Sequence, residues 1–393
     1  MKISLKKYLL YSSIVAIFSE SLFFNFIIDW KLLYLIIIVN YALLLRIKKL
    51  TFNKYFVFLI LGLLIHGLIT NSIIGVPPNF MLAQIIGIII LGSYYYNFIP
   101  LYDKEEILNV YVKLSLYAAI IGYPMYFLDI NLNDNRLQSI FKEPAHYVIV
   151  VLPACYYFLK SKKYLSFAII FGTLILSNSS LGYIGCGLMF IVPNISLKRL
   201  YYFVAIVPFI FGTFYYVYSE YPFFKMRVDD TYKSLNAVNT GKFEEYTNLS
   251  SYAILSNLFV TKNNITDHPF GSGIGSHTYM HKTHYFHRLK PPQYLVTQHL
   301  ERTNASDANS MFVRIISEMG ILGLLLIIVL LFLASKVFDK DLFLAQGIFI
   351  YILLKLFRDG HYFAPEFYFF IWLVYYYRMD SVEKKNTDQY KLS

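Results

Sequence analysis

The chain has 393 residues, of which 57% are hydrophobic and 15% are charged. A soluble protein of this size could not cover so much apolar surface with so few polar side chains, so most of its solvent must be lipid. The formal net charge is +11, but the basic residues occur in short clusters between hydrophobic runs rather than on one domain. This distribution argues against nucleic acid as a partner and indicates membrane topology instead.

Hydrophobic runs separated by polar residues extend over most of the chain. They are too long and too poor in charge to be ordinary strands, and a backbone in hydrocarbon must satisfy its hydrogen bonds internally. The pattern predicts an all-α polytopic membrane protein with about twelve transmembrane helices. In chain order, the predicted spans are 8–28, 32–45, 55–74, 79–99, 107–128, 145–159, 164–177, 181–195, 200–219, 310–335, 342–357 and 364–377.

Basic residues predict the orientation of these spans, because short cytoplasmic loops hold an excess of lysine and arginine. Alternate loops are rich in these residues, and this alternation puts both termini in the cytoplasm. The alternation therefore predicts a multi-pass membrane protein. The predicted division is 1–219 for the first nine helices, 220–309 for a large extracytoplasmic loop, 310–378 for the last three helices and 379–393 for a cytoplasmic tail.

The large loop contains six of the nine histidines. The spacing from His277 to His287 could place several imidazoles on one helical face, as a metal site requires. No carboxylate or cysteine accompanies them at ligand spacing, and Lys282 and Arg288 would repel a cation. We therefore expect no metal and no cofactor. The alternatives are a basic surface that contacts phosphate or sugar and a solvated loop.

Several charged residues lie at the ends of predicted spans or inside them, where ionisable groups are costly and are candidates for function. Arg136, Glu143 and His146 surround the start of the sixth span, although Glu143 could simply favour the helix N-terminus. Arg314 and Glu318 are one turn apart in the tenth span and could pair with each other. The segment from Arg358 to His361 gathers charge at an outer helix end.

Three stretches together resemble the O-antigen polymerase (Wzy-type) and O-antigen ligase superfamily. The first, from His268 to Gly275, is similar to the family's His-Pro followed by a Gly-x-Gly turn. The second is Asn309 and Ser310, nine residues, and then a Gly-x-x-Gly pattern that begins at Gly320. The third, from Arg136 to His146, resembles an Arg-x-x-x-x-Phe-x-x-Pro segment of polysaccharide polymerases.

The chain departs from the ligase pattern at Asn309, where ligases carry a histidine before the nine-residue spacer. Asparagine cannot serve as a general base, so this departure favours the polymerase. The chain also has Ser179 and Ser180 at a place where many members of the superfamily have Ser-Arg.

The resemblance implies a membrane glycosyltransferase of polysaccharide biosynthesis, located in the cytoplasmic (inner) membrane of a bacterium. It would transfer a glycan from undecaprenyl diphosphate onto a lipid-linked repeat unit at the outer face of the membrane, making O-antigen, capsule or exopolysaccharide. The alternatives are an O-antigen ligase and, from another class, a polytopic transporter or lipid-linked oligosaccharide flippase. Expected partners are the undecaprenyl-diphosphate-linked oligosaccharide and membrane lipid, with a chain-length regulator and a flippase as further candidates.

Under this interpretation, cations stabilise the departing diphosphate and a base receives the proton of the acceptor hydroxyl. The candidate catalytic residues are Glu143, His146 and His268. The candidate substrate-binding residues are Arg136, Arg288, Asn309, Arg314, Arg358 and His361.

Overall fold

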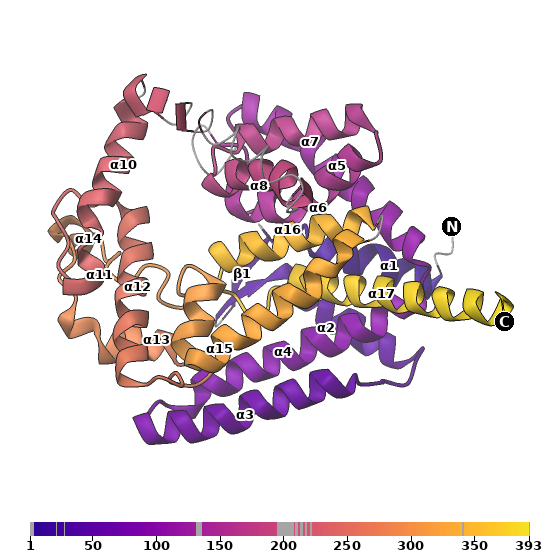
Figure 1. Ribbon diagram of the computed structural model, residues 1–393, viewed down its shortest axis with the longest axis horizontal. Helices are drawn as coiled ribbons and strands as arrows, with labels where there is room; N and C mark the ends of the chain where they lie inside the picture. Colours follow the sequence, from indigo (N-terminus) through magenta and orange to yellow (C-terminus); the bar gives the residue numbers. More distant parts are fainter. Residues whose placement is uncertain are drawn as a thin grey trace.

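The computed structural model describes residues 4–20, 22–26, 28–130, 136–194, 208, 211–212, 215–216, 218–220, 222–339 and 342–392. The described residues are mostly helical (Figure 1), with one short antiparallel hairpin of β1 (Phe23–Phe26) and β2 (Ile28–Lys31). The helices before residue 200 are α1 (Leu5–Ala16), α2 (Leu32–Leu45), α3 (Lys54–Ile74), α4 (Pro78–Phe98), α5 (Lys104–Phe127), α6 (Pro144–Lys160), α7 (Tyr164–Leu176) and α8 (Ser180–Ile191).

The remaining chain forms a group of shorter helices and then three long ones. Residues 222–309, named the loop domain below, contain α10 (Pro222–Ser234), α11 (Ala237–Thr240), α12 (Leu249–Asp267), α13 (His277–Tyr279) and α14 (Gln293–Thr297). The last three helices are α15 (Met311–Ser335), α16 (Phe343–Phe357) and α17 (Pro365–Leu392).

Four helices are long and apolar enough to cross a membrane: α3, α4 with the turn that follows it, α5, and α15 with the turn that follows it. The helices α2, α7, α8 and α16 are apolar but shorter. The helical fold class is therefore confirmed, whereas the number of twelve spans stays a prediction. Most of the ninth predicted span, 200–219, lies outside the described residues.

The first predicted span, 8–28, is not one continuous helix. The helix α1 ends at Ala16, and the chain then turns into the hairpin. Glu20 lies at this turn, where its carboxylate accepts hydrogen bonds from Lys31 (2.8 Å) and His146 (2.6 Å). Two such partners stabilise a charged group inside the protein. On a helix surface exposed to lipid, the same group would be unpaired.

Polar side chains begin several of the long helices. Asn53, Asp103 and Ser310 precede α3, α5 and α15, and each side chain accepts a hydrogen bond from a backbone N–H of the first turn. Short polar side chains at this position satisfy donors that the helix itself leaves open. The sequence therefore sets where these apolar runs start as helices.

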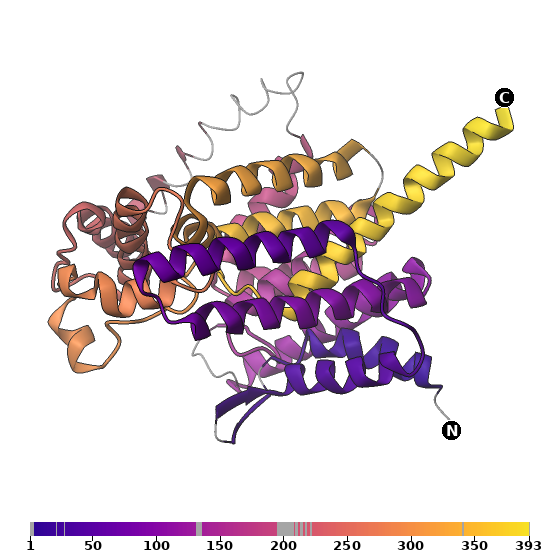
Figure 2. The ribbon, with the colours of Figure 1, turned by 90° about the horizontal axis from the view of Figure 1, so that it is seen from below.

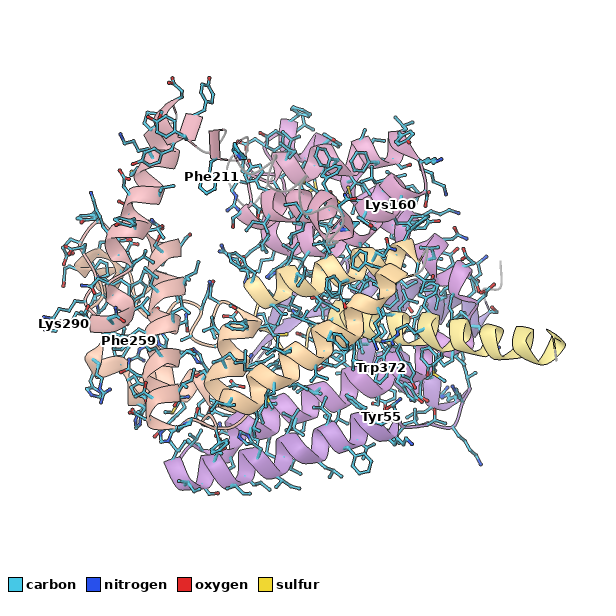
Figure 3. All side chains as sticks on the ribbon, in the orientation of Figure 1. Tyr55, Lys160, Phe211, Phe259, Lys290 and Trp372 are labelled. Atoms are coloured by element: carbon cyan, nitrogen blue, oxygen red, sulfur yellow. The ribbon has the colours of Figure 1, made fainter. Side chains whose placement is uncertain are left out.

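The long helices run side by side, and the loop domain lies at one end of them (Figures 1 and 2). Both termini lie at the opposite end in both views. Figure 3 shows Lys160 and Tyr55 at the end that holds the termini, and Lys290 and Phe259 in the loop domain. The structure therefore has two chemically different ends.

The centre of the helical bundle is a tight contact between α6 and α16. A Cβ at Gly347 of α16 would lie 2.8 Å from the Pro153 carbonyl oxygen of α6, so the small residue permits the close approach. The Tyr156 hydroxyl donates to Gln346 Oε1 across 2.8 Å in the same contact. This packing fixes the position of the chain that follows α16.

A break in α15 joins this helix to the loop domain. Gly320 has φ 56° and ψ −136°, a conformation that side chains disfavour, and a Cβ there would lie 2.0 Å from the Pro269 carbonyl oxygen. That oxygen accepts the Ile321 N–H at 3.0 Å. Two of the three stretches that carry the family resemblance are therefore in direct contact.

Candidate functional site

A polar pocket of about 190 Å³, named the arginine pocket below, lies at the end of the bundle that faces the loop domain. It is formed by the loop before α6, the turn between α7 and α8, the start of α12 and the end of α16. Its lining residues are Arg136, Glu143, Pro144, Ala145, Asn178, Ser179, Ser180, Ser250 and Arg358.

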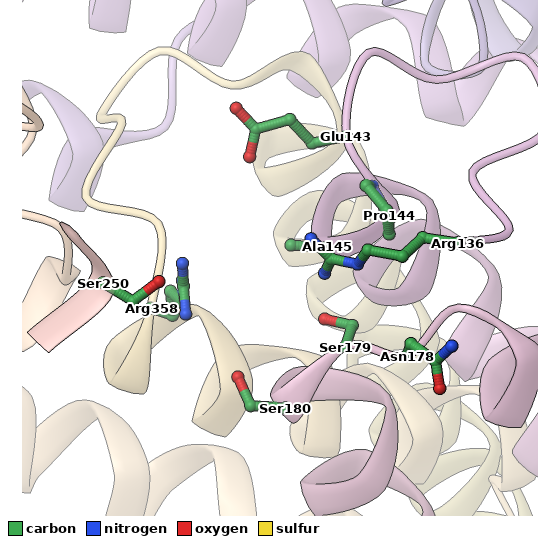
Figure 4. Close-up of a pocket in the computed structure, with 9 residues that line it drawn as sticks. All are labelled: Arg136, Glu143, Pro144, Ala145, Asn178, Ser179, Ser180, Ser250 and Arg358. Carbon is green, nitrogen blue, oxygen red and sulfur yellow. The ribbon is translucent and has the colours of Figure 1, made fainter. Parts of the chain in front are cut away.

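Two arginines reach this pocket from loops that are far apart in the sequence. Arg136 Nε donates to the Ser177 carbonyl oxygen at 3.4 Å, and the next residue, Leu137, donates its N–H to the Leu176 carbonyl oxygen at 3.0 Å. These bonds hold the loop before α6 against the end of α7. Arg358 directly follows α16. Figure 4 shows the two guanidinium groups approaching the pocket from opposite sides.

The charges of the arginine pocket suit an anion with several oxygens. Among the described residues that line the pocket, two carry a guanidinium group and one, Glu143, carries a carboxylate. Each guanidinium group can donate two parallel hydrogen bonds to phosphate oxygens. The hydroxyl groups of Ser179 and Ser180 add further polar atoms to the lining (Figure 4). This lining can therefore donate hydrogen bonds to a phosphate or diphosphate group.

Glu143 lies just before the first residue of α6, which is Pro144. It is exposed, and its side chain makes no capping hydrogen bond to the helix. Proline is favoured at this first position because it lacks the N–H that would otherwise stay open. The helix start is thus set by Pro144, and the Glu143 carboxylate is available at the edge of the pocket.

A second pocket of about 220 Å³ lies next to the arginine pocket. Consecutive residues line the two pockets. Ala145 and Arg358 line the arginine pocket, and the residues that follow them, His146 and Asp359, line the second pocket. The polar residues of the second pocket are Glu20, Lys31, Tyr34, His146, Asp359, His361 and Glu366.

Most charges of the second pocket are already paired. Lys355, at the end of α16, donates to Asp359 Oδ2 at 2.5 Å and lies 3.9 Å from a carboxylate oxygen of Glu366. Burial by itself would raise the pKa of the Asp359 carboxyl, but Lys355, His361 and His146 together outweigh it and hold this pKa well below its usual range. His361 Nε2 lies 3.7 Å from Asp307 Oδ2.

A cation could be considered at Asp307, Asp359 and His361, whose candidate ligand atoms lie within 4.8 Å of one another. Both oxygens of Asp359 already accept hydrogen bonds, from Lys355 and from the His361 backbone N–H. The Lys355 ammonium supplies the positive charge that a metal would otherwise supply. These contacts favour a salt bridge over a metal at this place.

Arg314, a predicted substrate-binding residue, is not among the lining residues of either pocket. Its side chain is 1% exposed, and its Nε donates to Glu318 Oε1 at 3.0 Å. A second nitrogen donates to the Gly360 carbonyl oxygen at 2.8 Å, and the guanidinium lies over the Tyr362 ring. Arg314 therefore supports the loop that carries Asp359 and His361 from behind.

Three further predicted residues also lie outside both pockets. Arg288 is exposed in the loop domain, where it donates to Asn263 Oδ1 and lies over the Tyr285 ring. His268 follows the end of α12. The buried Asn309 accepts the Asp359 N–H on its carbonyl oxygen at 3.3 Å, so it holds the same loop as Arg314 does.

The histidines of the loop domain do not share one face. His277 is buried, with its ring nitrogens 2.8 Å from Ser317 Oγ and 2.8 Å from Asn257 Oδ1. His281 is also buried, and burial lowers its pKa to about 4. His284 and His287 are exposed. Two of these histidines are therefore core residues, and only His284 and His287 are placed to contribute to a basic surface or a solvated loop.

Comparison with known proteins bears on the middle of the chain. Residues 165–328 match the family model described as O-antigen ligase. This match is consistent with the resemblance to the O-antigen polymerase and ligase superfamily. No curated protein matches the chain. The matched segment of this superfamily includes Ser179, Ser180 and Ser250 of the arginine pocket, while both arginines come from the flanking chain.

Proposed function

We propose that this protein is a polysaccharide polymerase of the bacterial envelope. It transfers a glycan from undecaprenyl diphosphate onto the terminal sugar of another lipid-linked repeat unit. The reaction needs no nucleotide sugar, because the diphosphate is already a good leaving group.

The observation that carries this proposal is the convergence of Arg136 and Arg358 on one pocket at a helix end. Positive charge placed where negative charge develops on the leaving diphosphate stabilises the transition state. The position at the end of the bundle also suits a lipid diphosphate, whose prenyl chain stays in the bilayer while its charged group lies at the surface. A transporter has less use for such a pocket at one end of its helices.

The orientation in the proposal is that the arginine pocket and the loop domain face away from the cytoplasm. The termini lie at the opposite end of the bundle (Figure 2), where the basic loops between α2 and α3 and between α6 and α7 also lie. Short loops rich in lysine and arginine favour the cytoplasmic side. The pocket would then meet lipid-linked glycans after their transfer across the membrane.

An O-antigen ligase is the second candidate, favoured by the description of the matching family. The same arginine pocket would serve it, since a ligase also releases the lipid diphosphate. The two differ in the acceptor, which is another lipid-linked glycan for a polymerase and a different molecule for a ligase.

Deletion of the gene in its own host distinguishes these functions. We expect the deletion strain to accumulate carrier-linked glycans of a single repeat, and the restored gene to return a ladder of lengths on gels of extracted lipid-linked glycans. A ligase predicts a different result, in which the full ladder remains on the carrier and fails to reach its final acceptor.

Elongation should not depend on a metal ion, because Lys355 already balances the carboxylate of Asp359. The measurement is the rate of glycan elongation in purified membranes with excess chelator, compared with the same membranes after magnesium or manganese is restored. Equal rates are expected. Complete loss of elongation that the metal reverses would contradict this prediction.

A further inference from the structure

The second pocket has one aromatic side and one polar side. Tyr34 and Phe363 stand together, with ring centroids 6.2 Å apart, and the Tyr34 hydroxyl donates to the Phe363 carbonyl oxygen at 3.3 Å. The charged and imidazole side chains described above form the rest of the lining. A sugar ring has this same character, with apolar C–H faces and hydroxyl groups around its edge. The volume of about 220 Å³ is sufficient for a single sugar.

The polar groups of this pocket differ in how firmly they are held. Glu20 bonds to both Lys31 and His146, so both oxygens of its carboxylate are already engaged. Asp359 is held by Lys355. These groups are suited to bind hydroxyls, but they are poor bases because their lone pairs or charges are already engaged.

The imidazole of His361 is held less firmly than these groups. Its side chain is 41% exposed, and its Nε2 faces the carboxylate of Asp307 at 3.7 Å. A carboxylate on one side of an imidazole favours the tautomer that carries its proton on that side, which leaves a lone pair on the other nitrogen. The residue thus combines access to the pocket with a tautomer that the charge of Asp307 favours.

We propose that the second pocket binds the acceptor sugar and that His361 is the catalytic base that takes the proton of its attacking hydroxyl. This inference rests on the proposed function and deepens it. Asp307 is the positioning residue, because its carboxylate lies 3.7 Å from the Nε2 atom of His361 and acts on the substrate only through this ring.

The shared wall of the two pockets brings the reacting groups together. The donor diphosphate lies with Arg136 and Arg358, and the acceptor lies on the other side of the Arg358–Asp359 segment. The acceptor oxygen forms the new bond to the anomeric carbon while the bond from that carbon to the diphosphate oxygen breaks. The bonding electrons leave with the diphosphate, and the acceptor proton moves to His361, which later releases it to water.

The charges around His361 suit this role near neutral pH. Partial burial lowers the pKa of the imidazole from its ordinary value, while Asp359 and Asp307 act in the opposite direction and Lys355 and Arg314 add to the lowering. The net direction is downward, so the ring is neutral at pH 7 and able to accept a proton.

The test compares His361→Gln and His361→Ala with wild type in purified membranes that contain the host's own lipid-linked repeat units. We expect the elongation rate to fall by about 100-fold or more in both variants, as for loss of a general base. The wild-type rate should decrease at acidic pH as the imidazole becomes protonated, and this acidic limb should be absent from His361→Gln. Added imidazole should partly restore His361→Ala. The matched control is His287→Gln, an exposed histidine of the loop domain.

The outcomes separate this inference from the proposed function. If wild-type membranes make no ladder, the proposed polymerase activity fails and the inference fails with it. If wild type elongates normally and His361→Gln does so at a similar rate, the polymerase stands and His361 is not its base. Loss of activity without imidazole rescue and with an unchanged acidic limb would also overturn the inference, because a structural defect gives that pattern.

Discussion

Replacing Arg358 with either lysine or alanine should reduce elongation by about 100-fold, which is the typical cost of losing one donor to developing charge. Lysine keeps the positive charge but loses the planar fork that binds two oxygens at once, so a bidentate contact to diphosphate predicts loss in both variants. The measurement is the ladder of glycan lengths in a deletion host that expresses each variant at equal membrane abundance. Accumulation of the single-repeat product is expected.

The matched control for this prediction is Arg302→Ala, which removes an exposed guanidinium of the loop domain that lies over the Phe286 ring. It should leave the ladder unchanged. The sequence also allows Arg358 to serve only as a partner of Asp359, but the structure pairs this carboxylate with Lys355. A purely structural arginine at a helix end would cost about 1 kcal/mol or less when removed. A wild-type ladder from Arg358→Ala would therefore remove this residue from the site.

Glu318→Gln should cause a large loss of stability with little change in shape. The Glu318 side chain is fully buried, and its carboxylate accepts from Arg314 and from the backbone N–H groups of Gly275 (2.8 Å) and His277 (3.3 Å). Removing its charge leaves the Arg314 guanidinium buried without a counter-ion. Breaking a buried pair in this way costs about 3–5 kcal/mol.

The measurement for Glu318→Gln is the temperature at which the detergent-solubilised protein loses its monodisperse peak in size-exclusion chromatography. Glu244→Gln is the matched control, since Glu244 is exposed in the loop domain. We expect a clear decrease for Glu318→Gln and none for the control. Equal transition temperatures would show that the buried pair contributes little to the attachment of the loop domain.

The residues of the arginine pocket were predictable because they lie at helix ends. Arg136, Glu143 and Arg358 are charged groups that border apolar runs, and the alternation of basic loops assigns them all to one end of the bundle. That reasoning brings residues together by topology without any knowledge of packing. Topology cannot say which side chains at that end of the bundle line the same pocket. The prediction therefore also included Arg288, which lies in the loop domain and lines neither pocket.

His146 and His361 were predicted as candidates, but the pairings within the second pocket were not predictable, because they depend on contacts between distant segments. Glu20 was visible as a charge inside an apolar run, but its partners Lys31 and His146 follow only from the turn after α1. Asp307 comes from the end of the loop domain, and nothing in the spacing relates it to His361. Hydrophobic periodicity carries no information about such pairs.

The spacing of the histidines from His277 to His287 does not show which of them share a face, because this segment is not a regular α-helix. An estimate of which residues share a face assumes a regular α-helix, whereas Met280–His284 form one turn of π-helix and Phe286–Arg288 a 3-10 turn. These turns rotate successive side chains by different angles. The glycine pattern from Gly271 to Gly275 was more informative, because its three glycines all have positive φ, as the predicted turn requires.

The buried attachment of the loop domain to α15 implies that ionic strength acts differently on the two sets of charges in this protein. Dissolved salt screens exposed charges over about 10 Å at 0.1 M, but it hardly reaches a pair inside the protein. Arg136 and Arg358 are only partly buried, so salt should weaken their attraction for an anionic lipid. Glu318 and Arg314 are closed to solvent, so the loop domain should stay in register with the pocket even in concentrated brine.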